Sequence, residues 1–163
     1  LSTELEAHLP KFSPDDTMIA TAGYDLLIRL WNLETKTQAA ELGPHEKPIQ
    51  SVAFSPDEKT LAAGDDTFGI TIWNLESRQK TATFSGHRGS VKSLAFSHAG
   101  DLLASGSSDS SIRLWDAKTG ELKATLAGHR NSVYDLHWSS DDRWLASGAF
   151  DRTARVWEIA NKR

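Results

Sequence analysis

Histidine, serine and aspartate, the residue types of a nucleophilic triad, recur together at fixed spacing along the chain. A triad needs the three side chains within hydrogen-bond reach, together with an exposed hydroxyl and an oxyanion hole. The same groups can instead satisfy one another in a buried network. We favour the network, because a repeated architecture needs one such set in every repeat and an enzyme does not. The two complete sets are His87, Ser105 and Asp109, and, 42 residues later, His129, Ser147 and Asp151.

Tryptophan, a second set of aromatic residues and a set of aliphatic residues also recur every 42 residues. Series that coincide without insertion or deletion indicate a tandem repeat. The tryptophans are Trp31, Trp73, Trp115 and Trp157, and a second aromatic series is Phe12, Phe54, Phe96 and Trp138. We expect the second series to form the core between repeats. Glycines at 64, 106 and 148 are expected at turns or bulges.

Within one repeat the local pattern predicts four short antiparallel strands. Residues 91–96 and 102–105 are short β-prone runs, while 111–115 and 121–126 alternate polar and apolar residues. The breaks between them are rich in Gly, Ser and Asp and have the length of hairpin connections. The chain carries no long stretch of helical period, so we expect an all-β protein.

A unit of this length that opens on Gly-His and closes on Trp-Asp resembles the repeat of the WD-repeat β-propeller family. Gly86-His87 and Trp115-Asp116 frame one such unit, and the next closes on Trp157-Glu158. The resemblance implies four-stranded antiparallel blades, about four of them, in an incomplete ring. We expect a single partial propeller over 1–163, with units 3–44 (a degenerate start), 45–86, 87–128 and 129–163, the last lacking its fourth strand.

The resemblance also implies that histidine, serine or threonine, aspartate and tryptophan form a linked structural tetrad in each blade. Complete tetrads are His87, Ser105, Asp109 and Trp115, and His129, Ser147, Asp151 and Trp157. Unit one offers Thr21, Asp25 and Trp31, with Thr3 at the histidine position. Unit two offers His45 and Trp73, with Ala63 and Thr67 at the serine and aspartate positions. We therefore expect blade two to be held mainly by packing.

Propellers act mainly through loops at their rims. Proteins that resemble this one bind partners with the loop before the first strand and the turn between the second and third strands. Aromatic residues and arginine are the types that supply interface hot spots. The corresponding residues are Tyr24, Asp66, Arg88, Ser90, Ser108, Arg130, Ser132 and Phe150.

Composition and motifs narrow the function classes. The 163 residues carry 18 Lys and Arg against 22 Asp and Glu, a net charge of −4, which argues against a nucleic-acid partner. The absence of cysteine excludes disulfides and thiolate metal sites. No metal-binding or phosphate-binding motif is present, so we expect no cofactor and no metal. No apolar run is long enough to suggest a membrane span, and the cytoplasm is the default compartment.

The two ends of the repeat array are irregular. Pro10 occupies the position of Val52, Leu94 and Leu136, which predicts a poor first strand, and unit four ends at Arg163 after its third strand. Either the chain belongs to a longer propeller, or two copies form an eight-bladed ring. The leading functional hypothesis is a non-catalytic scaffold that binds a protein or peptide. The alternatives are a regulatory or sensor portion of a larger protein and, less favoured, an enzyme with a site at the channel mouth.

Overall fold

The computed structural model describes residues 7–159 of the chain, and these form fifteen strands and no helix. The strands build four antiparallel sheets, each with its strands in chain order. Blade one is β1(Ala7–Phe12), β2(Met18–Gly23), β3(Ile28–Asn32) and β4(Thr37–Leu42), and blade two is β5(Ile49–Phe54), β6(Thr60–Asp65), β7(Ile70–Asn74) and β8(Gln79–Phe84). Blade three is β9(Val91–Phe96), β10(Leu102–Ser107), β11(Ile112–Asp116) and β12(Leu122–Leu126), and blade four is β13(Val133–Trp138), β14(Trp144–Ala149) and β15(Ala154–Glu158).

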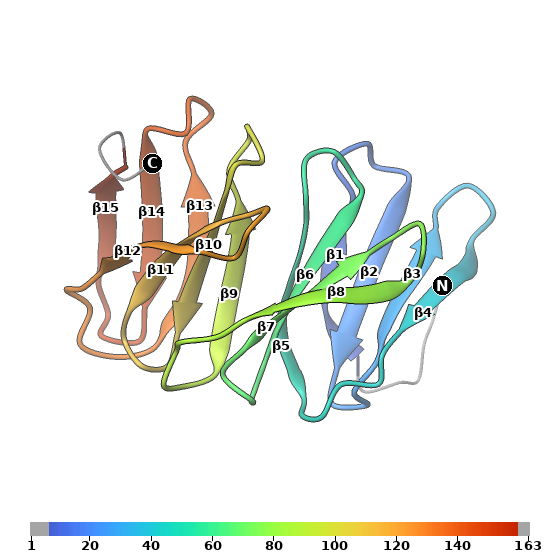
Figure 1. Cartoon of the computed structure of the whole chain (residues 1–163), viewed down its shortest axis with the longest axis horizontal. Coiled ribbons are helices and arrows are strands. Elements are labelled where there is room, and N and C mark those ends of the chain that lie inside the picture. Colours follow the sequence, from blue (N-terminus) through green and yellow to red (C-terminus); the bar gives the residue numbers. More distant parts are fainter. Residues whose placement is uncertain (1–6, 160–163) are drawn as a thin grey trace.

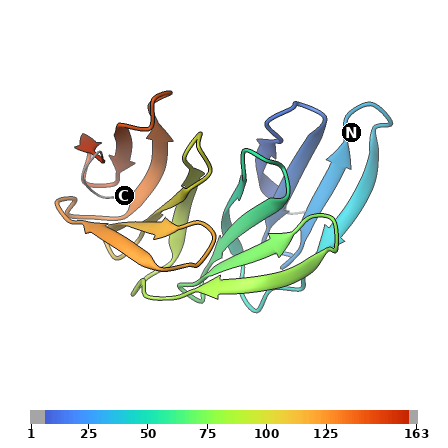
Figure 2. The same cartoon turned by 45° about the horizontal axis from the view of Figure 1, so that its top comes forward.

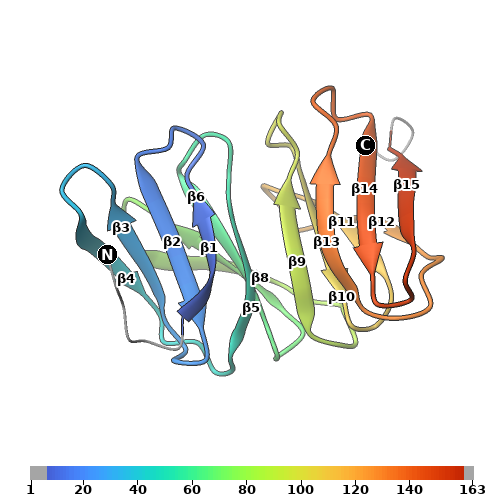
Figure 3. The same cartoon turned by 180° about the vertical axis from the view of Figure 1, so that it is seen from behind.

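The four blades lie side by side in an open arc, with blade one and blade four at its two ends (Figures 1 and 2). The first strands β1, β5, β9 and β13 gather on one side of the arc, as Figure 3 shows, and neighbouring first strands are in contact. The outer strands β4, β8 and β12 lie on the opposite side. The expected all-β fold, an incomplete propeller of about four blades, is confirmed.

Each joint between two blades has its own apolar core. At the joint between blades three and four, Ile112 and Leu114 of β11 pack with Val133 of β13 and Leu145 of β14. Separate clusters of the same kind fill the joints between blades one and two and between blades two and three. Alternation along the third strand thus places one set of side chains against the next blade, and every blade depends on its neighbour for burial.

The glycines at 64 and 106 lie inside strands β6 and β10, opposite a bulge in the first strand, and have a further role. A Cβ atom on Gly106 would lie 2.7 Å from Cγ1 of Val133, and one on Gly64 would lie 2.6 Å from Cγ1 of Val91. These glycines therefore let the first strand of the next blade approach closely. At Gly148 the nearest described atom, Cβ of Asp135, would be 3.7 Å away, because no described sheet follows blade four.

The second aromatic series is only partly core, which corrects the expectation. Phe54 is buried and Phe96 and Trp138 are half-buried, but Phe12 is 60% exposed. Val156 of β15 is 68% exposed, whereas Leu114, its equivalent in blade three, is fully buried. Both exceptions have the same cause, because no described sheet covers the outer surface of blade one or of blade four. We call these two surfaces, which carry Phe12 and Val156, the end faces.

The first strand of blade one forms despite Pro10. Ala7 and His8 pair with β2, and pairing resumes at Lys11 and Phe12 after a shift in register. Leu9, within the irregular stretch, has a φ of 84°. A bulge thus accommodates the proline, which cannot donate a ladder hydrogen bond.

Candidate functional site

In blade three the histidine, serine, aspartate and tryptophan are joined by side-chain hydrogen bonds. Nδ1 of His87 lies 2.9 Å from Oδ2 of Asp109, and Nε2 of His87 lies 2.7 Å from Oγ of Ser105. Nε1 of Trp115 donates to the same Ser105 oxygen at 2.8 Å. The network spans the loop before β9, the strands β10 and β11 and the turn between them, so it connects most of the blade.

The charge state of Asp109 determines which atoms of this network donate and which accept. Burial raises the pKa of Asp109, but hydrogen bonds from Ser111, from the Arg88 backbone N–H and from His87 outweigh it and hold the pKa well below its ordinary range. An ionised carboxylate only accepts, so Nδ1 of His87 carries the proton and Nε2 accepts from the Ser105 hydroxyl. The order serine to histidine to aspartate is that of a nucleophilic triad, but Ser105 has no exposed surface.

Blade four repeats the arrangement closely. Nδ1 of His129 lies 2.9 Å from Oδ2 of Asp151, and Nε2 lies 2.8 Å from Oγ of Ser147. Trp157 donates from Nε1 to Oγ of Ser147 at 2.8 Å. Hydrogen bonds from Thr153 and from the Arg130 backbone N–H lower the pKa of Asp151.

Blade two also has a polar network, which the expectation of a blade held mainly by packing did not include. Nδ1 of His45 lies 3.1 Å from Oδ2 of Asp65, which lies two residues before the repeat's aspartate position, Thr67. Nε1 of Trp73 donates directly to Nε2 of His45 at 3.2 Å. Because Ala63 supplies no hydroxyl between them, the indole and the imidazole bond to each other instead.

Blade one contains only part of the network among the described residues. Nε1 of Trp31 donates to Oγ1 of Thr21 at 2.9 Å. Asp25 pairs with the guanidinium of Arg29 instead of with a histidine. The histidine position of this unit, Thr3, lies outside the described residues.

The networks hold the loops of one rim in place. In blade three the N–H of Arg88 donates to Oδ2 of Asp109 at 2.9 Å, and the N–H of Ser108 donates to the carbonyl of Ser90 at 2.9 Å. In blades two, three and four the loop before the first strand is thereby fixed to the turn after the second strand. We call the surface formed by these loops and turns the loop face.

The eight residues expected on a partner-binding face all lie in these loops and turns. Arg88, Arg130, Tyr24 and Phe150 are exposed, with Phe150 the most exposed aromatic of the described chain at 69%. Half-buried members are Ser90, Ser108, Ser132 and Asp66. Equivalent bonds join blade four, where the Arg130 N–H donates to Asp151 and the Phe150 N–H donates to the Ser132 carbonyl.

Three contacts at this face were not foreseen from the repeat. Tyr134, at the start of β13, is 52% exposed, and its ring centroid lies 6.1 Å from that of Phe150. Nε2 of Gln50 donates to Oδ2 of Asp66 at 3.0 Å, and Nζ of Lys92 donates to Oε1 of Gln50 at 2.9 Å. Gln50, Lys92 and Tyr134 occupy one repeat position with three unrelated residue types. That departure from the repeat is the sequence signal that marks the position.

No group of three or more metal-ligating side chains occurs within residues 7–159. The same residues include no helix long and apolar enough to cross a membrane.

Comparison with known proteins identifies the repeat. The family described as WD domain, G-beta repeat, matches residues 5–32, 36–74, 78–116 and 120–158. A search of curated proteins found no match. From the second match onward, each matched unit starts beside the outer strand of one sheet and ends with the third strand of the next. With nearly its whole length matched and four sheets of the expected kind, the chain belongs to the WD-repeat family.

Proposed function

We propose that the protein is a non-catalytic scaffold that binds a protein or peptide partner through the loop face. WD repeats are generally protein-interaction modules. The observation that carries the proposal for this chain is the exposed Tyr134–Phe150 aromatic pair, in which Tyr134 lies on strand β13 and Phe150 on the turn that is bonded to the loop before it. Large aromatic residues and arginine on a pre-organised surface favour tight contacts, because little ordering remains to be done on binding.

An enzyme that uses the repeated serine is disfavoured by its surroundings. Ser105 is fully buried, and its hydroxyl oxygen is already engaged with Trp115 and His87. A substrate carbonyl must reach the nucleophile, which these contacts prevent. A regulatory or sensor role within a larger protein is compatible with the same binding face. We also propose a cytoplasmic location, since a chain without cysteine gains nothing from an oxidising compartment.

The end faces favour a larger assembly than one copy of the chain. Phe12 is exposed, whereas the residues at its repeat position in blades two to four are buried or half-buried. Val156 is exposed, whereas the residues at its repeat position in blades one to three are buried. We propose that each end face is covered either by a second copy, giving an eight-bladed ring, or by further blades of a longer chain. Nucleic acid and membrane remain outside the proposed partners.

The binding proposal is tested by affinity capture with quantitative mass spectrometry. Wild-type chain is compared with Phe150→Ala and Tyr134→Ala, and with Leu122→Ala as the control, because Leu122 is an exposed apolar residue of the outer strand β12. We expect proteins captured by the wild type to be lost from both loop-face variants and retained by the control. Equal capture by all four proteins would contradict a partner-binding loop face.

A further inference from the structure

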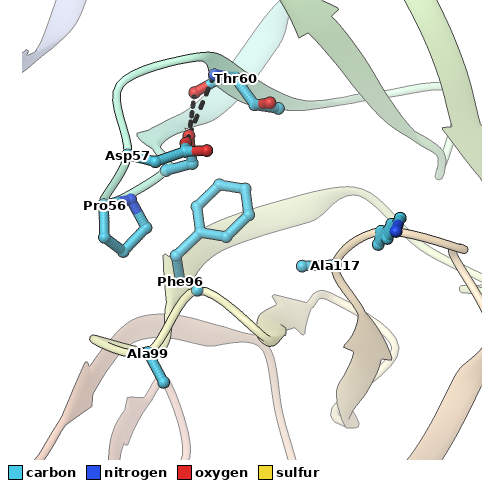
Figure 4. Close-up of a pocket in the computed structure, with 9 residues that line it drawn as sticks. Pro56, Asp57, Thr60, Phe96, Ala99 and Ala117 are labelled. Atoms are coloured by element: carbon cyan, nitrogen blue, oxygen red, sulfur yellow. Dashed lines mark hydrogen bonds between the residues drawn. The ribbon is translucent and has the colours of Figure 1, made fainter.

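A cavity of about 520 Å³ opens between blades two and three at the rim opposite the loop face. Its walls come from the β5–β6 turn, the β9–β10 turn and the β11–β12 turn, as the close-up in Figure 4 shows for several of them. The residues that matter for its chemistry are Pro56, Asp57, Phe96, Gly100, Ala117 and Lys118.

The corresponding groove between blades one and two is occupied by the protein's own side chains. Glu58, Leu75 and Arg78 line it and leave only about 160 Å³. Nη2 of Arg78 reaches across the joint and donates to the carbonyl of Ala39 at 3.2 Å. The repeat therefore has a way to fill this kind of groove with a basic side chain.

In the next repeat, smaller residues occupy the positions of these three side chains. Forty-two residues after Glu58, Leu75 and Arg78 stand Gly100, Ala117 and Gly120. Both Gly100 and Gly120 have positive φ, as do Glu58 and Arg78, so the backbone turns are alike. Beside Gly120 the ring of Phe84 fills the space, since a Cβ atom there would lie 2.5 Å from Cδ1 of Phe84. A Cβ atom on Gly100 would meet nothing closer than 3.6 Å, so space alone does not require glycine there.

The joint between blades three and four is bridged in a third way. Asp142, which follows Gly100 by 42 residues, accepts from the backbone N–H groups of His98 and Ala99 at 2.8 Å each. Nδ1 of His98 lies 3.0 Å from the same carboxylate, so this exposed histidine also takes part in the bridge. Trp138 also donates from Nε1 to the carbonyl of Ala95 at 3.0 Å. The groove between blades two and three thus lacks the bridging side chains of both its neighbours.

The walls of the open groove suit a planar cation. The ring of Phe96 lies beside Pro56 and Asp57 in Figure 4. Oδ1 of Asp57 accepts from Ser55 and from the Lys59 N–H, while Oδ2 has no hydrogen-bond partner among the described residues. The hydrogen bond from Ser55 lowers the pKa of Asp57, which keeps the carboxylate ionised at neutral pH. A guanidinium can stack on an aromatic ring and pair with a carboxylate at the same time.

We propose that this groove binds a single arginine side chain of a protein or peptide partner. The arginine stacks on Phe96 and pairs with Oδ2 of Asp57. Lys118 on the same groove disfavours a run of basic residues, so one isolated arginine fits better than a polybasic segment. The site lies on the rim opposite the loop face and is independent of the function proposed above.

The test is an NMR titration of the ¹⁵N-labelled full chain with the blocked peptide acetyl-Gly-Arg-Gly-amide. The matched probe replaces arginine by citrulline, which has the same shape without the charge. We expect saturating shifts at the amides of Asp57, Gly100 and Ala117, with citrulline binding at least about tenfold more weakly. Absence of saturable shifts there, or equal affinity for the two peptides, would overturn the proposal.

Variants separate the groove from general effects on the fold. Asp57→Asn removes the pairing charge, and its control is Asp15→Asn, because Asp15 makes the same turn contacts with Ser13 and Thr17 in blade one. We expect loss of arginine binding only in the first. Ala117→Leu restores the side chain found at Leu75 and should block the groove. Equal weakening by Asp57→Asn and Asp15→Asn would contradict the site, whereas Phe150→Ala should leave arginine binding unchanged.

Discussion

At the residue scale, burial decides what the histidine networks do. The His87 ring lies between a carboxylate and a hydroxyl with the connectivity of a catalytic triad, yet its serine has no contact with solvent. What the network does contribute is an acceptor for several backbone and side-chain donors. Asp109 alone accepts from the N–H groups of Arg88 and Ser111 as well as from His87.

Replacement of Asp109 by alanine should therefore lower the stability of the chain. It leaves the ring N–H of His87 and two backbone N–H groups without an acceptor, at a cost of about 1–3 kcal/mol. The urea midpoint measures the effect, and Glu76→Ala, an exposed acidic residue in the β7–β8 turn, is the control. An Asp109→Ala midpoint equal to that of the wild type would show that the network does not stabilise the chain.

Stability should also fall as the pH falls below neutrality. Burial lowers the pKa of His87, and this outweighs the opposing effect of Asp109. The unfolded state, with an ordinary histidine pKa of about 6.5, then binds more protons than the folded state. The contribution of neutral His87 to the free energy of unfolding is complete above about pH 6.5. It is lost as the pH falls towards the lower pKa that His87 has in the folded state. Urea midpoints at pH 7 and pH 5 should differ, and less so in His87→Gln. An identical difference in the variant would assign the effect to other groups.

At the scale of the elements, the strands were readable from the sequence because their period is local. The prediction of 91–96 coincides with β9, while β10 continues two residues beyond the predicted 102–105. The features that the sequence did not predict depend on neighbours. In blade two the repeat's aspartate position holds Thr67, and Asp65, at the end of its strand, bonds to His45 instead. Phe12 has the same repeat position as Phe54, but among the described sheets only Phe54 has one in front of it.

The strand glycines give a direct test of how blades pack. Gly106→Ala should destabilise the chain by about 1–3 kcal/mol, because the added methyl group overlaps Val133 of the next blade. Gly148→Ala should have little effect in a monomer, since nothing described lies closer than 3.7 Å, and an effect like that of Gly106→Ala where an assembly covers blade four. Thermal unfolding of the two variants provides the comparison. A large loss in Gly148→Ala would show that another sheet covers blade four in solution.

At the scale of the whole molecule, the open arc leaves one apolar surface at each end. Large apolar side chains exposed there, Phe12 at one end and Val156 at the other, favour association. The curvature of the arc and the order of the blades follow from the repeat, but its completion does not, because the same joint can be made within one chain or between two copies. The sequence therefore predicted the blade and the joint more fully than the assembly.

We expect the 163-residue chain to associate in solution, with a mass above 17.9 kDa by light scattering. Val156→Arg should reduce association, because it places a charge on the end face, and Leu122→Arg on the outer strand should not. A discrete species of twice the chain mass would favour the two-copy ring, and larger aggregates would favour further blades of a longer chain. A stable wild-type monomer would count against both.

The offset between repeat and blade has a consequence for cutting the chain. A break after residue 77 falls within the β7–β8 turn, so one piece would hold β5, β6 and β7 while the other would hold β8. A break after residue 86 leaves whole sheets on both sides. Two separately made halves of the first kind would each display an unpaired strand edge that only the other half completes. Such halves are suited to a split reporter, in which reassembly depends on the pairing of β8 from one half with β7 of the other.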